Sequence, residues 1–373
     1  MEKHLHIVCL DTPYPLDYGG IFDPFCKIQS LHQLGIKIHL HCFEYGRGKQ
    51  PELDKYCVTV NYYQRNKGHK GFSIKLPYIV CSRSNKELPE NLLKDDYPIL
   101  LEGVHCTYLL NDSRFNKRKI ILRLHNVECI YYRQLNRSTA SLLKKIYFFL
   151  ESKILYRYEK SIANKAFIVA MAEGDAAYYL NEFGAENIEY LPVFFPFQKV
   201  TAKPGEGCYC LYHGNLSVPE NERAVIWLLK NVFNDLSFPF VIAGKKPSAY
   251  LERVVHHHQH TCLVASPSEQ EMQDIIGKAQ LHILPSFNCT GIKLKLLNAL
   301  YNGRHCVVNE EAVRNTGLDS VCHIGSTAGS FKKIISTMYH QPISTEEIGR
   351  RESLLGDRYN NMQNAEKLIQ WIW

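Results

Sequence analysis

Short apolar runs alternate with segments of helix length along almost the whole chain of 373 residues. This alternation predicts βαβ units, in which a crossover helix joins two parallel strands. The expected strands cover residues 6–10, 36–42, 97–103, 119–125, 166–172 and 187–193 in the first half and 208–214, 238–244, 260–266, 281–286, 305–309 and 321–325 in the second. We therefore predict an α/β protein with two Rossmann-like, doubly wound parallel-sheet domains.

The length of the chain also favours two domains, because one hydrophobic core seldom holds this many residues. The segment 195–207 is rich in Pro, Gly and Lys, which is typical of a linker. We expect a first domain at 1–195, a linker at 196–207, a second domain at 208–356 and a C-terminal helix at 357–373. That helix ends in Trp371 and Trp373, bulky side chains that need a surface to cover.

Composition excludes several classes of protein. Hydrophobic residues make up 45% of the chain and charged residues 22%, which is typical of globular domains. The net charge of +7 is spread along the chain without a polybasic stripe, so we expect anionic small molecules or a membrane surface as partners and no nucleic acid. No apolar run reaches the roughly 18 residues of a membrane helix. The 13 cysteines are scattered and odd in number, and the chain starts directly with a strand pattern, so we expect a cytoplasmic protein with reduced thiols.

One stretch, residues 284–308, combines a strand, a glycine turn, a helix and a second strand. The loop reaches Gly291, the helical pattern follows, and Gly303 ends it. The free N–H groups at such a helix start favour an anion. Lys293 and Lys295 in the first turn oppose the helix dipole, so they suit a bound phosphate better than they suit helix stability.

This stretch resembles the donor-sugar loop of retaining GT-B glycosyltransferases, especially glycosyltransferase family 4. The resemblance implies a cleft between the two domains, a last helix that crosses back to the N-terminal domain, and two glutamates eight positions apart in the loop. Those positions fall on Thr290 and Asn298 in this chain. By the resemblance, Thr290 would hydrogen-bond the donor sugar and Asn298 the nucleotide ribose.

Further motifs follow the order of the same family. Asp17, Gly19 and Gly20 resemble the D-x-G-G loop that faces the donor diphosphate. Gly214 occupies a strand-end position that the family places against the phosphates, and Lys245 offers a second phosphate contact. Around Ser266 and Pro267 the family reads the nucleobase through backbone groups.

His125 ends an expected strand within His-Asn-Val-Glu, a segment that resembles the H-N-x-E motif of the family. The resemblance assigns it as the catalytic residue, which hydrogen-bonds the donor sugar or stabilises charge. The alternative is a strand-end histidine that bonds only to backbone. Glu102, at another strand end, would face the acceptor or a structural water.

Two other clusters have plain interpretations. His256, His257, His258 and His260 lie near Cys262 and could bind a metal, but adjacent histidines diverge, so we expect no metal site. Residues 142–160 are aromatic and basic; they form either a domain helix packed on the core or a peripheral contact with the inner face of a membrane.

Together these features predict a metal-independent glycosyltransferase of hexosyl type. It would move a sugar from a nucleotide-diphospho-sugar to an acceptor hydroxyl, with retention, in polysaccharide or glycolipid synthesis. It would need no cofactor besides its substrates, the nucleotide sugar and a glycan or lipid-linked acceptor. Because Thr290 and Asn298 replace the glutamates, a non-catalytic sugar-nucleotide or glycan-binding protein is an alternative, and a sugar-nucleotide epimerase is a second.

Overall fold

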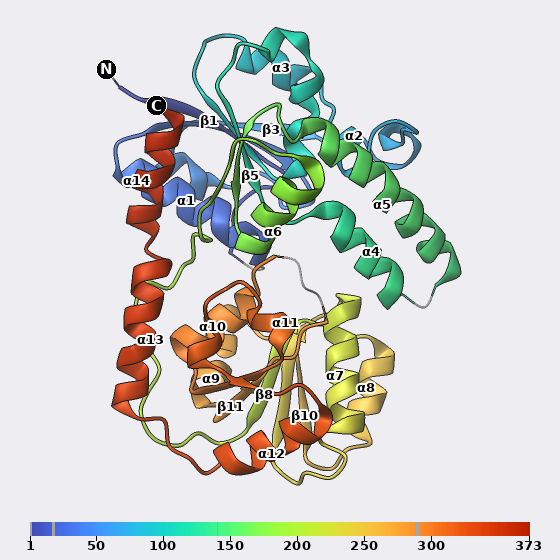
Figure 1. Cartoon of the computed structure of the whole chain (residues 1–373), viewed down its shortest axis with the longest axis vertical. Helices are drawn as coiled ribbons and strands as arrows, with labels where there is room; N and C mark the ends of the chain where they lie inside the picture. The colour runs from blue at the N-terminus through green and yellow to red at the C-terminus, as the bar shows by residue number, and fades with distance from the viewer. Residues whose placement is uncertain (1, 17–18, 140, 288–290) are drawn as a thin grey trace. The chain divides into compact units, whose positions relative to one another are not determined.

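The structure, a computed structural model, describes residues 2–16, 19–139, 141–287 and 291–373 (Figure 1). The chain divides into two compact units. The first comprises Met1–Pro196, Thr290–Ile292 and Tyr359–Trp373, and the second comprises Phe197–Cys289 and Lys293–Arg358. None of the described helices is long and apolar enough to cross a membrane.

The first unit is built on a parallel sheet of seven strands in the order β3-β2-β1-β4-β5-β6-β7. The strands are β1 (His4–Cys9), β2 (Lys37–Glu44), β3 (Cys57–Gln64), β4 (Ile99–Glu102), β5 (Ile120–Leu124), β6 (Phe167–Ala170) and β7 (Ile188–Tyr190). The α-helices are α1 (Phe22–Gln33), α2 (Tyr78–Cys81), α3 (Glu87–Leu92), α4 (Glu128–Ser138), α5 (Leu142–Ile162), α6 (Glu173–Tyr178) and α14 (Asn361–Ile372). Short 3₁₀ segments are η1 (Gly19–Ile21), η2 (Pro51–Lys55), η3 (Gly68–Gly71), η4 (Val104–Asn111) and η5 (Ser113–Phe115), and η6 (Tyr179–Phe183) is a π-helix.

One strand of this sheet, β3, escaped the sequence analysis. Its residues, CVTVNYYQ, alternate polar and apolar side chains and are mostly exposed or half-buried. β3 pairs only with β2 and so forms an edge of the sheet. An edge strand lacks the continuous apolar run by which buried parallel strands are recognised, and this explains the omission.

The second unit repeats the architecture with a parallel sheet of six strands in the order β10-β9-β8-β11-β12-β13. Its strands are β8 (Cys210–Asn215), β9 (Phe240–Lys245), β10 (Thr261–Ala265), β11 (Leu281–Ile283), β12 (His305–Val308) and β13 (His323–Ile324). Its helices are α7 (Pro219–Asn231), α8 (Ala249–His256), α9 (Glu269–Lys278), α10 (Leu294–Asn302), α11 (Glu310–Val313), α12 (Ala328–Met338) and α13 (Thr345–Arg358), with a 3₁₀ turn η7 (Asp319–Val321). The predicted class, two Rossmann-like parallel-sheet domains, is confirmed.

The strand order of each sheet reverses direction once. In the first sheet the reversal lies between β1 and β4, and in the second between β8 and β11. Open α/β sheets bind ligands beyond the carboxyl ends of the strands at such a switch point. The topology therefore marks one place in each unit where a ligand is expected.

The C-terminal helix α14 packs against α1 in the first unit, where the two helices lie side by side in Figure 1. Ala365, Leu368 and Ile372 are buried in the core beneath the sheet, and the Trp371 ring lies 5.8 Å from that of Phe167. Asn361 accepts from Phe195 N–H and donates to its carbonyl. The expected linker forms hydrogen bonds with the second unit; for example, Thr201 N–H donates to Tyr301 O.

Candidate functional site

The candidate site of the first unit lies at its switch point. Glu102 is the last residue of β4, and Arg123 lies one position from the end of the neighbouring strand β5. The helix α1, which follows the Gly19–Gly20 turn, adds Asp23 and Lys27, one helical turn apart on the same face. These four charged side chains are all buried.

The four form a continuous ionic network in the order Arg123, Asp23, Lys27 and Glu102. The Lys27 ammonium lies 2.7 Å from Asp23 Oδ2 and 2.5 Å from Glu102 Oε1. Arg123 donates from Nη2 to Asp23 Oδ1 at 2.8 Å and to the carbonyl of Pro192, and from Nη1 to the carbonyl of Leu191. Two cations thus balance two carboxylates, which is the condition for holding charges in a dry interior.

Electrostatics keep both carboxylates ionised. Burial by itself would raise the pKa of Asp23, but Arg123 and Lys27 outweigh it and hold that pKa far below its usual range. Burial opposes ionisation of Glu102 in the same way, and Lys27 and the hydrogen bond from His125 lower its pKa.

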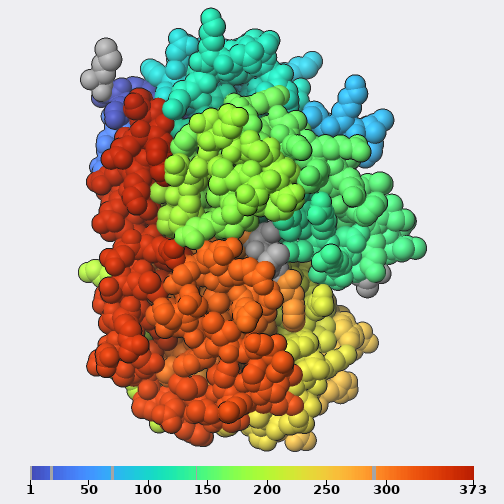
Figure 2. All heavy atoms as spheres, in the orientation of Figure 1, coloured from blue at the N-terminus to red at the C-terminus, as the bar shows by residue number. Residues whose placement is uncertain are grey.

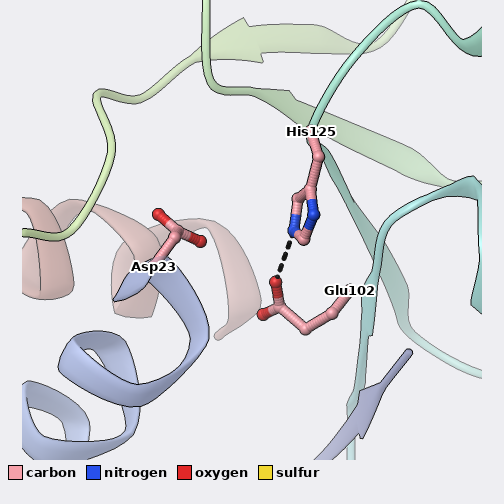
Figure 3. Close-up of side chains that lie close together, drawn as sticks. All are labelled: Asp23, Glu102 and His125. Carbon is pink, nitrogen blue, oxygen red and sulfur yellow. Dashed lines mark hydrogen bonds and ion pairs between the residues drawn. The ribbon is translucent and has the colours of Figure 1, made fainter. Parts of the chain in front are cut away.

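His125 follows β5 directly and contacts this network at one point. Its Nε2 lies 2.9 Å from Glu102 Oε2, so Nε2–H donates to the carboxylate (Figure 3). The bond goes to a side chain, which contradicts the alternative of a histidine bonded only to backbone. Because the carboxylate selects the tautomer with the proton on Nε2, Nδ1 becomes the nitrogen that can accept a proton or a hydrogen bond. The imidazole keeps 13% of its surface exposed.

Asp23, Glu102 and His125 also have the composition of a metal site. They are the only group of three or more metal-ligating side chains close enough together in the described part of the chain, with ligand atoms within 4.8 Å of one another. However, the Lys27 ammonium already lies against both carboxylates. A divalent cation would have to displace this buried ammonium or be repelled by it, so the residues do not fit a metal. The histidines around 256–260 form no such group among the described residues.

The candidate site of the second unit also lies at its switch point, where β8 ends at Gly214 and Asn215. Gly214 and Gly244 are register partners on β8 and β9, and a Cβ on Gly244 would lie only 1.9 Å from Gly214 O. Glycine is therefore required at 244 by close approach of the two strands. Lys245 is the next residue, at the end of β9.

Lys295 points inward from the first turn of α10. Its Nζ donates to Tyr212 Oη at 2.9 Å and to Asn221 Oδ1 at 3.0 Å, and it lies 4.7 Å from the centre of the Tyr212 ring. Its aliphatic stem passes 3.8 Å from the position of a Cβ on Gly214. The predicted lysine and the predicted glycine are thus brought together at the end of β8.

The surroundings make Lys295 a weaker base than an ordinary lysine. Burial lowers its pKa to about 8; nearby Glu220 opposes this shift, and Lys293 adds to it. An arriving phosphate would restore the ordinary affinity of the ammonium for its proton. Lys293 is the residue before α10, at the N-cap position.

Of the remaining predicted donor residues, Ser266, Pro267 and Asn298 belong to the second unit and Gly291 to the first. Ser266 follows β10 with a left-handed backbone (φ 52°), donates its N–H to Gly244 O and accepts from Lys246 N–H. Pro267 follows it. Asn298 lies on α10, where its Oδ1 accepts a hydrogen bond from Asn302. Gly291 has a left-handed backbone (φ 63°). Thr290 and Asp17 lie outside the described residues.

Sequence reasoning missed Asp23, Lys27 and Arg123, and it expected Glu102 to face the acceptor or a water. The structure contradicts this view of Glu102, which bonds to Lys27 and His125. A signal was present: Arg123 interrupts the apolar run KIILRL, and Lys27 interrupts FDPFCKI. A charge inside a buried pattern requires a partner, although the pattern does not say which one.

Residues 207–337 match the family "Glycosyl transferases group 1". Over its whole length the chain has the fold of sucrose-phosphate synthase from Thermosynechococcus elongatus, with a TM-score of 0.72 and 11% identity, covering 99% of this chain and 98% of that one. The two sheets and these matches confirm the resemblance to GT-B glycosyltransferases.

Two further relatives are similar. Anabaena HepE, solved in complex with UDP and glucose, has a TM-score of 0.66 and 11% identity, covering 98% of both chains. An uncharacterized 44.6 kDa protein in the cps region of Klebsiella pneumoniae is 28% identical over 329 residues, which cover 83% of this chain and 84% of that protein.

Proposed function

We propose that this chain is a retaining, metal-independent glycosyltransferase that moves a hexose from a nucleotide-diphospho-sugar to the hydroxyl of a glycan or lipid-linked acceptor. The observation that carries the proposal is the inward position of Lys295 at the start of α10, beside Gly214 and the switch point of the second sheet. A buried ammonium at a helix N-terminus neutralises the leaving diphosphate, which is the role a metal has in other transferases.

Each unit supplies a separate part of the chemistry. In the second unit, Lys293, Lys295 and Lys245 would hold the phosphates. Backbone groups near Ser266 and Pro267 would recognise the nucleobase. Asn298 would bind the ribose. In the first unit, His125 would hydrogen-bond the donor sugar through Nδ1, while Glu102 holds its ring in place. Thr290 would contact a donor-sugar hydroxyl, and Gly19, Gly20 and Gly291 would let backbone approach the ligand. The known complex of HepE with UDP and glucose supports a uridine nucleotide as the first donor to try.

The test begins with the binding of nucleotides. We expect thermal stabilisation of the full chain by one of UDP, GDP, ADP or their sugars, because a ligand of the folded state raises the unfolding temperature. Lys295→Ala and Lys293→Ala should each lower the affinity of the protein for that nucleotide at least tenfold. Lys278→Ala is the matched control, since its exposed ammonium pairs with Asp274 on α9. Unchanged nucleotide affinity in both variants would contradict the phosphate assignment.

Turnover assays distinguish a glycosyltransferase from the two alternative functions, a non-catalytic binding protein and an epimerase. A transferase consumes the nucleotide sugar only when an acceptor accepts the sugar, apart from slow hydrolysis. Binding without consumption across an acceptor panel would favour a non-catalytic binding protein, and a free isomerised product made without acceptor would favour an epimerase.

A second proposal concerns α5, which we infer docks on an anionic membrane surface. The N-terminal half of α5 exposes five large apolar residues, each with between 52% and 81% of its surface accessible to solvent: Leu142, Leu143, Ile146, Phe149 and Leu150. Lys144, Lys145 and Lys153 are exposed on the same helix. Figure 2 shows α4 and α5 at the surface of the first unit. The sequence left open whether this helix is covered by the core, and only its C-terminal half is buried.

Anionic lipid suits this helix because apolar side chains enter the interface while lysines bind head groups. In flotation with vesicles of phosphatidylglycerol and phosphatidylcholine, we expect binding that requires the anionic lipid. The double change Leu142→Glu and Leu143→Glu should abolish flotation, whereas Leu180→Glu, at an exposed apolar site on η6, should not. Equal flotation with neutral vesicles, or no effect of the double change, would refute the proposal.

A further inference from the structure

One pocket of the first unit is not used by the proposed donor chemistry. It is a pocket of about 300 Å³ within this unit. Several of its lining residues come shortly after strands: Asp11 two positions after β1, Tyr45 directly after β2 and Arg65 directly after β3. The pocket therefore lies along the carboxyl edge of the first sheet, where ligands of open α/β folds bind, and its volume is at the lower end of the range for small-molecule sites.

The pocket is rich in positive charge. Arg65 and Arg83 both line it, and neither guanidinium forms an ion pair with a carboxylate among the described residues. Arg83 is 6% exposed and donates to two neutral acceptors, the carbonyls of Leu10 and Ile79. The acidic residue of the wall, Asp11, is engaged by Arg47 at 3.3 Å. Two like charges thus share one partly dry space, an arrangement that an anion would relieve.

Two further observations point to a ligand. Arg65 Nε is buried and makes no hydrogen bond to the described residues, whereas Nη2 of the same guanidinium donates to Ser82 Oγ at 3.3 Å. Burial, followed by repulsion from Arg65, lowers the pKa of Arg83 to about 10. Both features favour the binding of an anion beside the two guanidinium groups.

The other walls are aromatic. Tyr45, Tyr78, Tyr132 and Tyr147 line the pocket, and the Arg65 guanidinium lies 4.3 Å from the centre of the Tyr45 ring. Aromatic faces with a polar edge suit the apolar faces of a sugar ring and its hydroxyl groups. A simple inorganic anion has no apolar face that could pack against these four rings.

The pocket neighbours the candidate catalytic histidine. His105, which lines it, and His125 flank the same residue: a Cβ on Gly103 would lie 3.4 Å from His105 Nδ1 and 3.6 Å from His125 Nδ1. A saccharide bound here would therefore have one end close to His125.

We propose that this pocket binds the acceptor, and that the acceptor is a saccharide with an acidic group, a carboxylate or a phosphate ester, held by Arg65 and Arg83. The acceptor role of the bound saccharide rests on the proposed transferase function. The binding of an acidic saccharide to the pocket can be measured without turnover.

The experiment is calorimetry of the full chain with methyl glucuronide, glucose 6-phosphate, methyl glucoside and inorganic phosphate. We expect one or both acidic sugars to bind about ten- to hundredfold more tightly than methyl glucoside, the difference expected for a charge-assisted hydrogen bond. The two acidic sugars separate a carboxylate acceptor from a phosphate one. Equal affinity for the neutral sugar would overturn the proposal, and so would inorganic phosphate that binds as well as the best acidic sugar.

Variants assign the effect to the pocket. Arg65→Gln should reduce the affinity for the acidic sugar at least tenfold and leave that for methyl glucoside unchanged, and Arg65→Lys should fall between. Arg114→Gln, an exposed arginine of the same unit, is the matched control. Retained acidic-sugar binding in Arg65→Gln would refute the assignment. Nucleotide binding in each variant reports on the second unit, so failure of the donor proposal and failure of this one are distinguishable.

Discussion

His125 Nε2 lies 2.9 Å from Glu102 Oε2, and the same carboxylate bonds through its other oxygen to the ammonium of Lys27. Glu102 therefore couples the candidate catalytic imidazole to a fully buried ionic network. The network fixes both the orientation of the ring and its tautomer, in the way that a carboxylate orients a histidine in other enzymes.

Replacement of His125 should slow transfer without loss of the donor nucleotide. For His125→Asn we expect a rate about ten- to hundredfold lower, the cost of one charge-assisted hydrogen bond lost from the reacting complex. Steady-state kinetics would measure the rate, and thermal stabilisation by the nucleotide would serve as the control. A normal rate in this variant would remove His125 from the mechanism.

Replacement of Lys27 should destabilise the first unit strongly. Lys27→Met leaves Asp23 and Glu102 buried with one cation fewer, and breaking a buried pair in this way costs about 3–5 kcal/mol. Urea unfolding followed by fluorescence would measure the loss. Lys55→Met removes an exposed lysine paired with Glu52 and should leave the unfolding midpoint nearly unchanged. Similar midpoints for the two variants would show that the network contributes no stability.

Stability should be greatest near pH 6. Burial lowers the pKa of His41 and His213 to about 3, below the unfolded value of 6.5, so the unfolded chain binds more protons and stability is lost as the pH falls below 6.5. Burial also raises the pKa of Glu128 to about 8 and that of Glu159 to about 7. These two groups contribute stability that is complete below about pH 4.5, the pKa of an ordinary Glu, and is lost as the pH rises from there through 7 and 8.

Urea midpoints at pH 4.5, 6 and 8 would measure both limbs of this profile. Glu159→Gln should flatten the alkaline limb because it removes a titrating group, and its single amide oxygen can still accept one of the two hydrogen bonds from the N–H groups of Glu128 and Cys129. A midpoint that rises steadily to pH 8 would contradict the expected protonation of these glutamates.

Replacement of two glycines by alanine should change the stability of the protein in opposite directions. Gly244→Ala places a methyl group against Gly214 O and Leu216, so we expect a loss of about 1–3 kcal/mol together with weaker nucleotide binding. Gly349 lies exposed within α13 with nothing near its Cβ position, and Gly349→Ala should stabilise by about 0.5–1 kcal/mol through helix propensity. Thermal unfolding would compare the two, and a stabilising Gly244→Ala would show that the strands can separate.

The arrangement of the proposed donor residues on α10 could be predicted because these residues are close in sequence. Lys293, Lys295 and Asn298 lie on or beside one helix, and a strand–turn–helix pattern alone places that helix start at the sheet edge. The partners of Lys295, Tyr212 and Asn221, could not be predicted, since they come from a strand and a helix more than 70 residues away.

The sequence by itself determined the two parallel sheets, because strands buried on both faces need continuous apolar runs and this requirement is local. It also marked His125 at a strand end. Only the tertiary structure decided that Glu102 turns to Lys27 and His125, and that Asp23 meets Arg123 a hundred positions along the chain. Such charges are tolerable only in pairs, and strand order, which no local pattern encodes, decides which pairs form.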